Sequence, residues 1–177
     1  MNICVFCGSG TGKKRVFADA ASELGTLLAN NRHTLVYGGG NIGLMGILAD
    51  AVLENKGKVI GIIPGFLMQK EVGHTGLTQL EVVNSMHERK KRMADLSDAF
   101  ITMPGGWGTL DETAEILTWK QLGLIYQPIG ILNVDGFFDS LISQMDLMVQ
   151  QNFLKSLNLE LVKVSHSPEE LLKQLIP

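Results

Sequence analysis

Residues 99–112, Ala-Phe-Ile-Thr-Met-Pro-Gly-Gly-Trp-Gly-Thr-Leu-Asp-Glu, decide the fold. Their first part, residues 99–103, is short, apolar and bounded by a proline, which predicts a buried strand. Three glycines follow within four residues, and a helical pattern then runs over residues 109–122. A buried strand that passes through a glycine turn into a helix is the repeating unit of parallel α/β sheets.

The same alternation extends along the whole chain. Six strands are expected, at residues 3–6, 34–37, 59–63, 80–83, 99–103 and 129–132. Helices are expected at residues 15–30, 44–55, 86–96, 109–122, 137–150 and 168–175. This order predicts an α/β fold, a doubly wound, Rossmann-like and mainly parallel sheet flanked by helices. Neither a linker nor an internal repeat divides the chain, so residues 1–177 are expected to form a single domain.

Composition and charge exclude several classes of protein. The chain has 177 residues, of which 45% are hydrophobic and 19% charged, as in a globular protein. The net charge of −3, with basic residues scattered except at 89–92, argues against a nucleic-acid partner. No apolar run approaches the roughly 18 residues of a membrane span, and the first ten residues lack a signal-peptide pattern. We therefore expect a cytoplasmic protein without a membrane partner.

The two cysteines, Cys4 and Cys7, have the C-x-x-C spacing of thioredoxin-like redox pairs. Cys4, however, lies within an expected strand, where residues three apart point to opposite faces of the sheet. Redox pairs instead occupy a helix start. A redox function is therefore not expected.

In doubly wound sheets, ligands bind beyond the carboxyl ends of the strands. After the first strand, Gly8 and Ser9 open a glycine-rich turn, but Lys13 breaks the dinucleotide pattern G-x-G-x-x-G. Cys7 and Lys14 break the Walker A pattern in the same way. The turn remains a weak anion-binding signal, and tight-turn geometry is the alternative explanation.

After the second strand come Gly38, Gly39 and Gly40, followed by Gly43 and Gly46. Three successive glycines cost backbone entropy unless something approaches the main chain closely or φ must be positive. A ligand crossing Gly39 and Gly40 is the functional interpretation. Close packing of helix on strand is the alternative, and it is the expected reason for Gly43 and Gly46.

The glycine turn at residues 104–108 is the strongest candidate site. Gly105, Gly106 and Gly108 leave backbone N–H groups bare at a helix start, where phosphate is favoured, and Thr109 adds a hydroxyl. Alternatively, Thr109 and Glu112 form a capping box, in which Glu112 bonds back to the Thr109 amide. The two interpretations compete for the same donors.

Residues 86–93 begin the helix after the fourth strand. The segment is a near miss for the zinc motif H-E-x-x-H, because Lys91 stands where the second histidine belongs, and no metal is expected. Cations at a helix start oppose the helix dipole unless an anion faces them. Arg89 and Lys90 are therefore candidate anion-binding residues, whereas Lys91 and Arg92 are expected to be solvated. The irregular stretch 64–78 is expected to fold over an opening as a loop.

These motifs together resemble the LOG (Lonely Guy) family of cytokinin riboside 5′-monophosphate phosphoribohydrolases, whose members are often labelled lysine decarboxylases. The similarity extends from Cys-Val-Phe-Cys-Gly-Ser at 4–9 to Leu-Asn-Val-Asp-Gly at 132–136, and its signatures lie at 86–90 and 104–112. It implies that Arg89 and Glu112 are the catalytic pair, that no cofactor is needed and that the protein is a homodimer. It also implies that the glycine loop with Thr109 holds the 5′-phosphate. Together with the residues singled out from the sequence, the expected substrate-binding residues are Gly8, Ser9, Gly39, Gly40, Met86, Lys90, Gly105, Gly106, Gly108 and Thr109.

The expected reaction is hydrolysis of the N-glycosidic bond of a purine nucleoside 5′-monophosphate, AMP or an N6-modified AMP, to the free base and ribose 5-phosphate. Positive charge develops on the ribose in such a reaction, and a carboxylate such as Glu112 stabilises it. The alternative is a nucleotide-binding sensor or carrier that uses the same phosphate cradle without hydrolysis.

Overall fold

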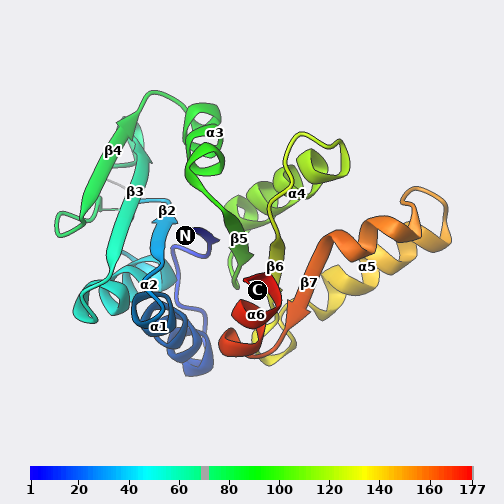
Figure 1. Ribbon diagram of the computed structural model, residues 1–177, viewed down its shortest axis with the longest axis horizontal. Helices are drawn as coiled ribbons and strands as arrows, with labels where there is room; N and C mark the ends of the chain where they lie inside the picture. The colour runs from blue at the N-terminus through cyan, green and yellow to red at the C-terminus, as the bar shows by residue number, and fades with distance from the viewer. Residues whose placement is uncertain (69–71, 177) are drawn as a thin grey trace.

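The structure is a computed structural model that describes residues 1–68 and 72–176. Its centre is a seven-stranded sheet in the order β4-β3-β2-β1-β5-β6-β7, and every neighbouring pair is parallel (Figure 1). The strands are β1 (Asn2–Phe6), β2 (Thr34–Tyr37), β3 (Lys58–Pro64), β4 (Gln79–Val83), β5 (Ala99–Thr102), β6 (Ile129–Leu132) and β7 (Val162–Ser165). The predicted α/β class with a parallel sheet is confirmed.

In the described part of the chain, the α-helices that connect and cover the strands are α1 (Arg15–Asn30), α2 (Gly43–Glu54), α3 (Met86–Leu96), α4 (Trp107–Gln121), α5 (Asp139–Gln150) and α6 (Pro168–Leu175). The 3-10 turns are η1 (Gly65–Leu67), η2 (Val134–Gly136) and η3 (Ser156–Leu161). The predicted bounds of α1, α3 and α6 are confirmed, whereas α4 begins two residues earlier than expected and α5 two residues later.

The prediction of six strands was wrong, because β7 forms a seventh at one edge of the sheet. Its four residues, Val-Lys-Val-Ser, have only their two ends buried. An edge strand packs against one neighbour and keeps polar residues, so it lacks the continuous apolar run that marks the inner strands.

Two hydrophobic cores lie on opposite faces of the sheet. Helices α1, α2 and α6 pack on the face that receives Ile3 and Val5 of β1. Helices α3, α4 and α5 pack on the face that receives Cys4 and Phe6. Cys7 belongs to the first core and Cys4 to the second, and both thiols are free. The prediction that the two cysteines face opposite sides of the sheet is confirmed.

The order of the strands creates a crevice beside β1. From β1 the chain winds outward through β2, β3 and β4, and then returns to the other side of β1 as β5. The loops after β1 and β5 therefore leave the sheet toward opposite faces, which opens a space at their carboxyl ends. The crevice is where a ligand site is expected in such a fold.

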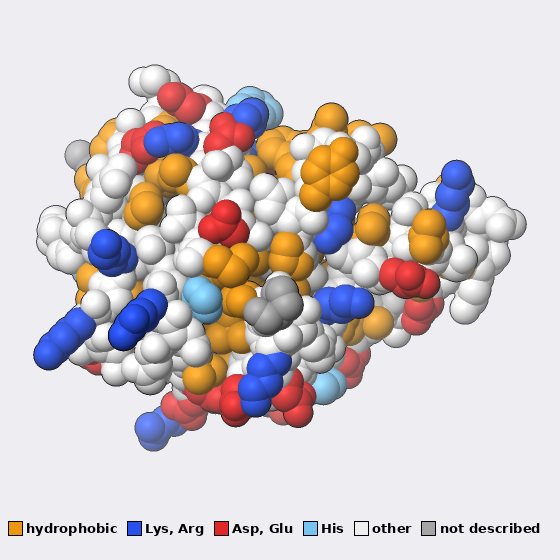
Figure 2. Space-filling view, in the orientation of Figure 1, with side chains coloured by type: hydrophobic (Ala, Val, Ile, Leu, Met, Phe, Trp, Pro, Cys, Tyr) orange, Lys and Arg blue, Asp and Glu red, His pale blue; other side chains and the backbone are white. Residues whose placement is uncertain are grey.

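Charged side chains of both signs are interspersed on the face of the molecule shown in Figure 2. The chain also forms ion pairs, such as Arg92 Nε with Glu81 Oε1 at 2.8 Å and Lys173 Nζ with Glu169 Oε1 at 2.7 Å. Within the described ranges, no helix has both the length and the apolar character needed to cross a membrane.

Candidate active site

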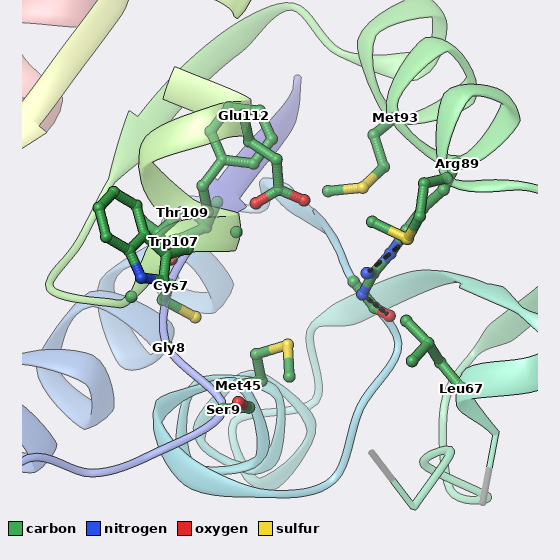
Figure 3. A pocket seen from close by; sticks show the side chains of 16 residues that line it. Cys7, Gly8, Ser9, Met45, Leu67, Arg89, Met93, Trp107, Thr109 and Glu112 are labelled. Carbon is green, nitrogen blue, oxygen red and sulfur yellow. Dashed lines mark hydrogen bonds between the residues drawn. The ribbon is translucent and has the colours of Figure 1, made fainter. Parts of the chain in front are cut away.

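A cavity lies at the carboxyl ends of β1, β2 and β5, at the expected crevice (Figure 3). It is bounded by the loop after β1, the turn after β2 and the first turns of α3 and α4. Its lining residues are Val5, Phe6, Cys7, Gly8, Ser9, Gly38, Met45, Leu67, Met86, Arg89, Met93, Gly106, Trp107, Gly108, Thr109 and Glu112.

Helix α4 presents its N-terminus to this cavity. Gly106 is the N-cap and makes no side-chain capping bond, so Thr109 lies inside the first turn. The capping-box prediction was therefore wrong, because it requires Thr109 to precede the helix. The first N–H groups of a helix have no partner within it, and the positive end of the helix dipole lies at the same place. This arrangement can bind an anion.

The glycines of the α4 turn have two different roles. A Cβ added to Gly106 or Gly108 would meet no atom within 4 Å, so these positions are open on the cavity side. A Cβ on Gly105 would instead lie 2.1 Å from Thr109 Oγ1 and 2.9 Å from the Gly8 nitrogen. Gly105 thus lets two loops pack together, and it is not among the residues that line the cavity.

The loop after β1 is joined by backbone hydrogen bonds to its neighbours. The Gly8 nitrogen donates to the Pro104 carbonyl at 3.0 Å, and the Gly8 carbonyl accepts from the Leu44 nitrogen at 3.1 Å. A Cβ on Gly43 would lie 2.2 Å from the Ser9 backbone, and one on Gly46 would lie 2.7 Å from the Asn41 carbonyl oxygen. Close packing thus explains Gly43 and Gly46, but the helix start packs on the loop after β1 and on the turn after β2, and not on a strand as predicted.

Arg89 enters the cavity from the first turn of α3. Ser85 caps this helix and accepts a hydrogen bond from the Glu88 nitrogen at 3.1 Å. The Arg89 side chain is 5% exposed, and its Nε donates to the Ile62 carbonyl at 3.0 Å while Nη2 donates to the Gly38 carbonyl at 2.7 Å. Two backbone carbonyls, one in β3 and one just after β2, thus fix the plane of the guanidinium.

The other members of the basic run 89–92 point away from the cavity. Lys90 Nζ lies 3.0 Å from Asp111 Oδ2 and 3.1 Å from Glu115 Oε2, so it links α3 to α4. Lys91 pairs with Asp95, and Arg92 pairs with Glu81. Burial alone would lower the pKa of Lys90, but its hydrogen bonds to the two carboxylates raise that pKa above its usual value. Successive helical residues point in different directions, so one basic run serves several roles.

Glu112 faces Arg89 from the opposite wall. Figure 3 shows its carboxylate pointing into the cavity from α4, while the guanidinium of Arg89 lies across from it on the α3 side. Burial, followed by the negative charge of Glu112, raises the pKa of the Cys7 thiol. Cys7 therefore stays protonated and is not a nucleophile, although it lines the cavity.

The cavity brings together eight of the twelve residues predicted for the site: Gly8, Ser9, Met86, Arg89, Gly106, Gly108, Thr109 and Glu112. Gly39, Gly40, Lys90 and Gly105 are not among its lining residues. Gly39 has φ of +76°, and Gly40 forms an isolated bridge with Gly73. Gly39 therefore allows the backbone to turn, and Gly40 joins this turn to the loop after β3.

Sequence reasoning missed an apolar wall formed by Met45, Met93 and Leu67 beside the predicted Met86. A signal for Met93 was available, because residues 86, 89 and 93 share one helical face. Leu67 belongs to the stretch 64–78 that was expected to cover an opening, and it does line the cavity. Residues 69–71 of that stretch lie outside the described residues. Among the residues that are described, no group of three or more His, Cys, Asp and Glu could hold a metal ion.

The chain is similar in sequence to proteins of a known family. Residues 45–175 match a family model described as "Possible lysine decarboxylase". Two proteins of Arabidopsis thaliana, the cytokinin riboside 5′-monophosphate phosphoribohydrolases LOG1 and LOG3, are 46% and 47% identical to this chain over 173 residues. The matches span 98% of this chain and 81% and 80% of those relatives.

Among solved structures, the molybdenum cofactor binding protein of the bacterium Rippkaea orientalis is similar, with a TM-score of 0.72. It is 27% identical, and the match covers 99% of this chain and 97% of that one. The fold of the present chain therefore also occurs in a protein whose description names a bound cofactor and no reaction.

Proposed function

The chain belongs to the LOG family of phosphoribohydrolases, and from this premise we propose that it hydrolyses the N-glycosidic bond of a purine nucleoside 5′-monophosphate. The products are the free base and ribose 5-phosphate. One observation carries the proposal: Arg89 and Glu112 lie on facing walls of a cavity that is also lined by the N-terminus of α4. The proposed substrate is AMP or an N6-modified AMP.

The 5′-phosphate is assigned to the first turn of α4. Gly106 and Gly108 leave room for an anion to approach the backbone N–H groups, and the buried Thr109 lines the same part of the cavity. The helix dipole adds to the attraction. Gly8 and Ser9, on the loop after β1, complete the polar end of the cavity.

Glu112 is assigned to the ribose. When the bond between C1′ and the base nitrogen breaks, the base takes the bonding pair and positive charge develops on the sugar. Water then adds its oxygen at C1′ and releases one proton, which balances the proton that the departing base takes up. A fixed carboxylate stabilises that charge, or accepts the proton of the attacking water. Arg89 fixes the orientation of the Glu112 carboxylate or contacts the phosphate. Its bonds to the Gly38 and Ile62 carbonyls orient it for either role.

The base is assigned to the apolar wall formed by Met45, Met86, Met93 and Leu67. Methionine side chains are flexible and polarisable, so they adapt to a flat purine and to substituents of different size. This wall supports a purine substrate, and a panel of N6-substituted nucleotides ranked by kcat/KM identifies the preferred one.

The site does not fit the decarboxylase description that the family model carries. Amino-acid decarboxylation with a pyridoxal cofactor requires a lysine that forms a Schiff base with it. The described residues that line the cavity include no lysine.

The experiment that tests the function is incubation of the purified protein with AMP, with adenine and ribose 5-phosphate as the measured products. Glu112→Gln should lower kcat by roughly 10²- to 10⁴-fold while AMP binding and Tm are retained. Glu23→Gln, at an exposed position of α1, is the matched control and should keep normal turnover. Tight AMP binding without turnover in the wild-type protein would instead identify a carrier.

The homodimer belongs to the same proposal. An apolar groove runs between α4 and α5, lined by Leu117, Leu141, Met145 and Met148 among others. Met148 is 38% exposed there, and Phe153 just beyond α5 is 86% exposed. Exposed apolar surface of this kind is typical of a subunit interface. Sedimentation should give a dimer for the wild type and a monomer for Met148→Lys; a wild-type monomer with full activity would contradict the assignment.

A further inference from the structure

Gly38, at the end of β2, lies in contact with the guanidinium of Arg89. A Cβ added to Gly38 would lie 2.2 Å from Arg89 Nη2 and 3.1 Å from Cζ. Ordinary van der Waals contact begins at 3.4 Å, so the guanidinium occupies the space that any other residue's side chain would take. The same Nη2 donates to the Gly38 carbonyl at 2.7 Å.

The backbone of Gly38 does not itself require glycine. Gly39 next to it has φ of +76°, a conformation that favours glycine, whereas Gly38 is not among the positive-φ residues. The third of the three nearest atoms is the Met45 sulfur, 3.2 Å from the added Cβ, at the flexible end of its side chain. The main obstacle to alanine at position 38 is therefore the Arg89 side chain.

Arg89 could yield to a Cβ only by leaving its acceptors. The guanidinium is buried, and it is held between the Ile62 carbonyl at 3.0 Å and the Gly38 carbonyl at 2.7 Å. Relief of the overlap requires a shift of about 1 Å to reach normal carbon–nitrogen contact. Such a shift breaks at least one of these hydrogen bonds and moves the guanidinium relative to Glu112.

We propose that Gly38 is a positioning residue for the reaction, because its missing side chain is what allows Arg89 to lie flat on the end of β2 and face Glu112. Gly38, the first glycine of the triplet, thus makes room for the Arg89 side chain and not for a ligand, and Gly39 forms the turn. This inference rests on the proposed function for its kinetic consequence, but the contact between Gly38 and Arg89 can be tested without activity.

The experiment is a double-mutant cycle of Gly38→Ala and Arg89→Ala, with AMP hydrolysis and Tm both measured. Gly38→Ala alone should lower kcat about 10²-fold, the scale of a 1 Å misplacement of a catalytic group, and should also lower Tm. In the Arg89→Ala background the space is vacant, so Gly38→Ala should change neither kcat nor Tm further. Gly65→Ala, where the added Cβ meets only Val82 at 3.7 Å, is the matched control for replacing a strand-end glycine.

Two results would overturn the proposal. One is equal loss of Tm and kcat from Gly38→Ala in both backgrounds, which would mean that the glycine serves something other than Arg89. The other is normal turnover and Tm in Gly38→Ala alone. If the wild-type protein hydrolyses no nucleotide, the proposed function fails, but the Tm cycle still decides whether Gly38 makes room for Arg89.

Discussion

Replacing Thr109 with valine tests whether the first turn of α4 holds the 5′-phosphate. Thr109 is 4% exposed and lines the cavity between Gly108 and Glu112. Valine keeps the shape of the side chain and removes only the hydroxyl. The assay is kcat/KM for AMP and for adenosine, which differ by the phosphate alone.

The expected size of the effect follows from one lost hydrogen bond to a charged group. Such a bond contributes about 1.5–3 kcal/mol, so kcat/KM for AMP should fall about 10- to 150-fold. Adenosine has no phosphate to lose contact with, and its kcat/KM should not change. The preference for AMP over adenosine should therefore shrink by the same factor. In the wild type this preference should appear in kcat as well as in KM, because remote binding energy positions the ribose.

Thr113→Val is the matched control, one turn further along α4. Its hydroxyl donates to the Thr109 carbonyl at 2.6 Å and lies 2.9 Å from the Thr102 hydroxyl, and Thr113 is not among the cavity-lining residues. It should lower Tm by about 2–4 °C for each kcal/mol lost and leave the AMP preference intact. An unchanged preference in Thr109→Val, or an equal loss in Thr113→Val, would refute a phosphate site at this turn.

Two further predictions concern groups beside the cavity. Lys90→Met removes the ion pairs with Asp111 and Glu115 and should lower Tm by about 2–4 °C, since partly exposed pairs contribute about 1 kcal/mol. The folded-state pKa of Lys90 is raised, so this difference in Tm should persist up to the ordinary pKa of a lysine and be lost as the pH rises through the higher folded-state pKa. A higher KM for AMP at unchanged Tm would instead support the predicted contact with substrate. Burial raises the pKa of both Cys4 and Cys7, so neither thiol should react with iodoacetamide at pH 8 until the protein unfolds, and rapid labelling of the native protein would contradict this.

Local patterns in the sequence were sufficient for the fold class. Short apolar runs alternating with helical periods predicted six of the seven strands, and the end of each run marked the loops where the cavity lies. These signals are local because an inner strand is buried on both faces and a helix on one. The bounds of α4 were less well predicted, because Trp107 and Gly108 are poor markers of a helix start, yet the helix has Gly106 as its N-cap and includes both of them in its first turn.

The sequence by itself determined the chemical groups available at the site: a glycine turn before a helix, a hydroxyl and a carboxylate within it, and an arginine on another helix. Tertiary structure alone decided which of them meet. Lys90 and Arg89 are adjacent in the chain, yet Arg89 reaches the ends of β2 and β3 whereas Lys90 pairs with α4. The glycines at 38–40 were recognised as a place of close approach, but the sequence could not name Arg89 as the approaching group. Such contacts join residues 51 positions apart, and only the packing of α3 against the sheet brings them together.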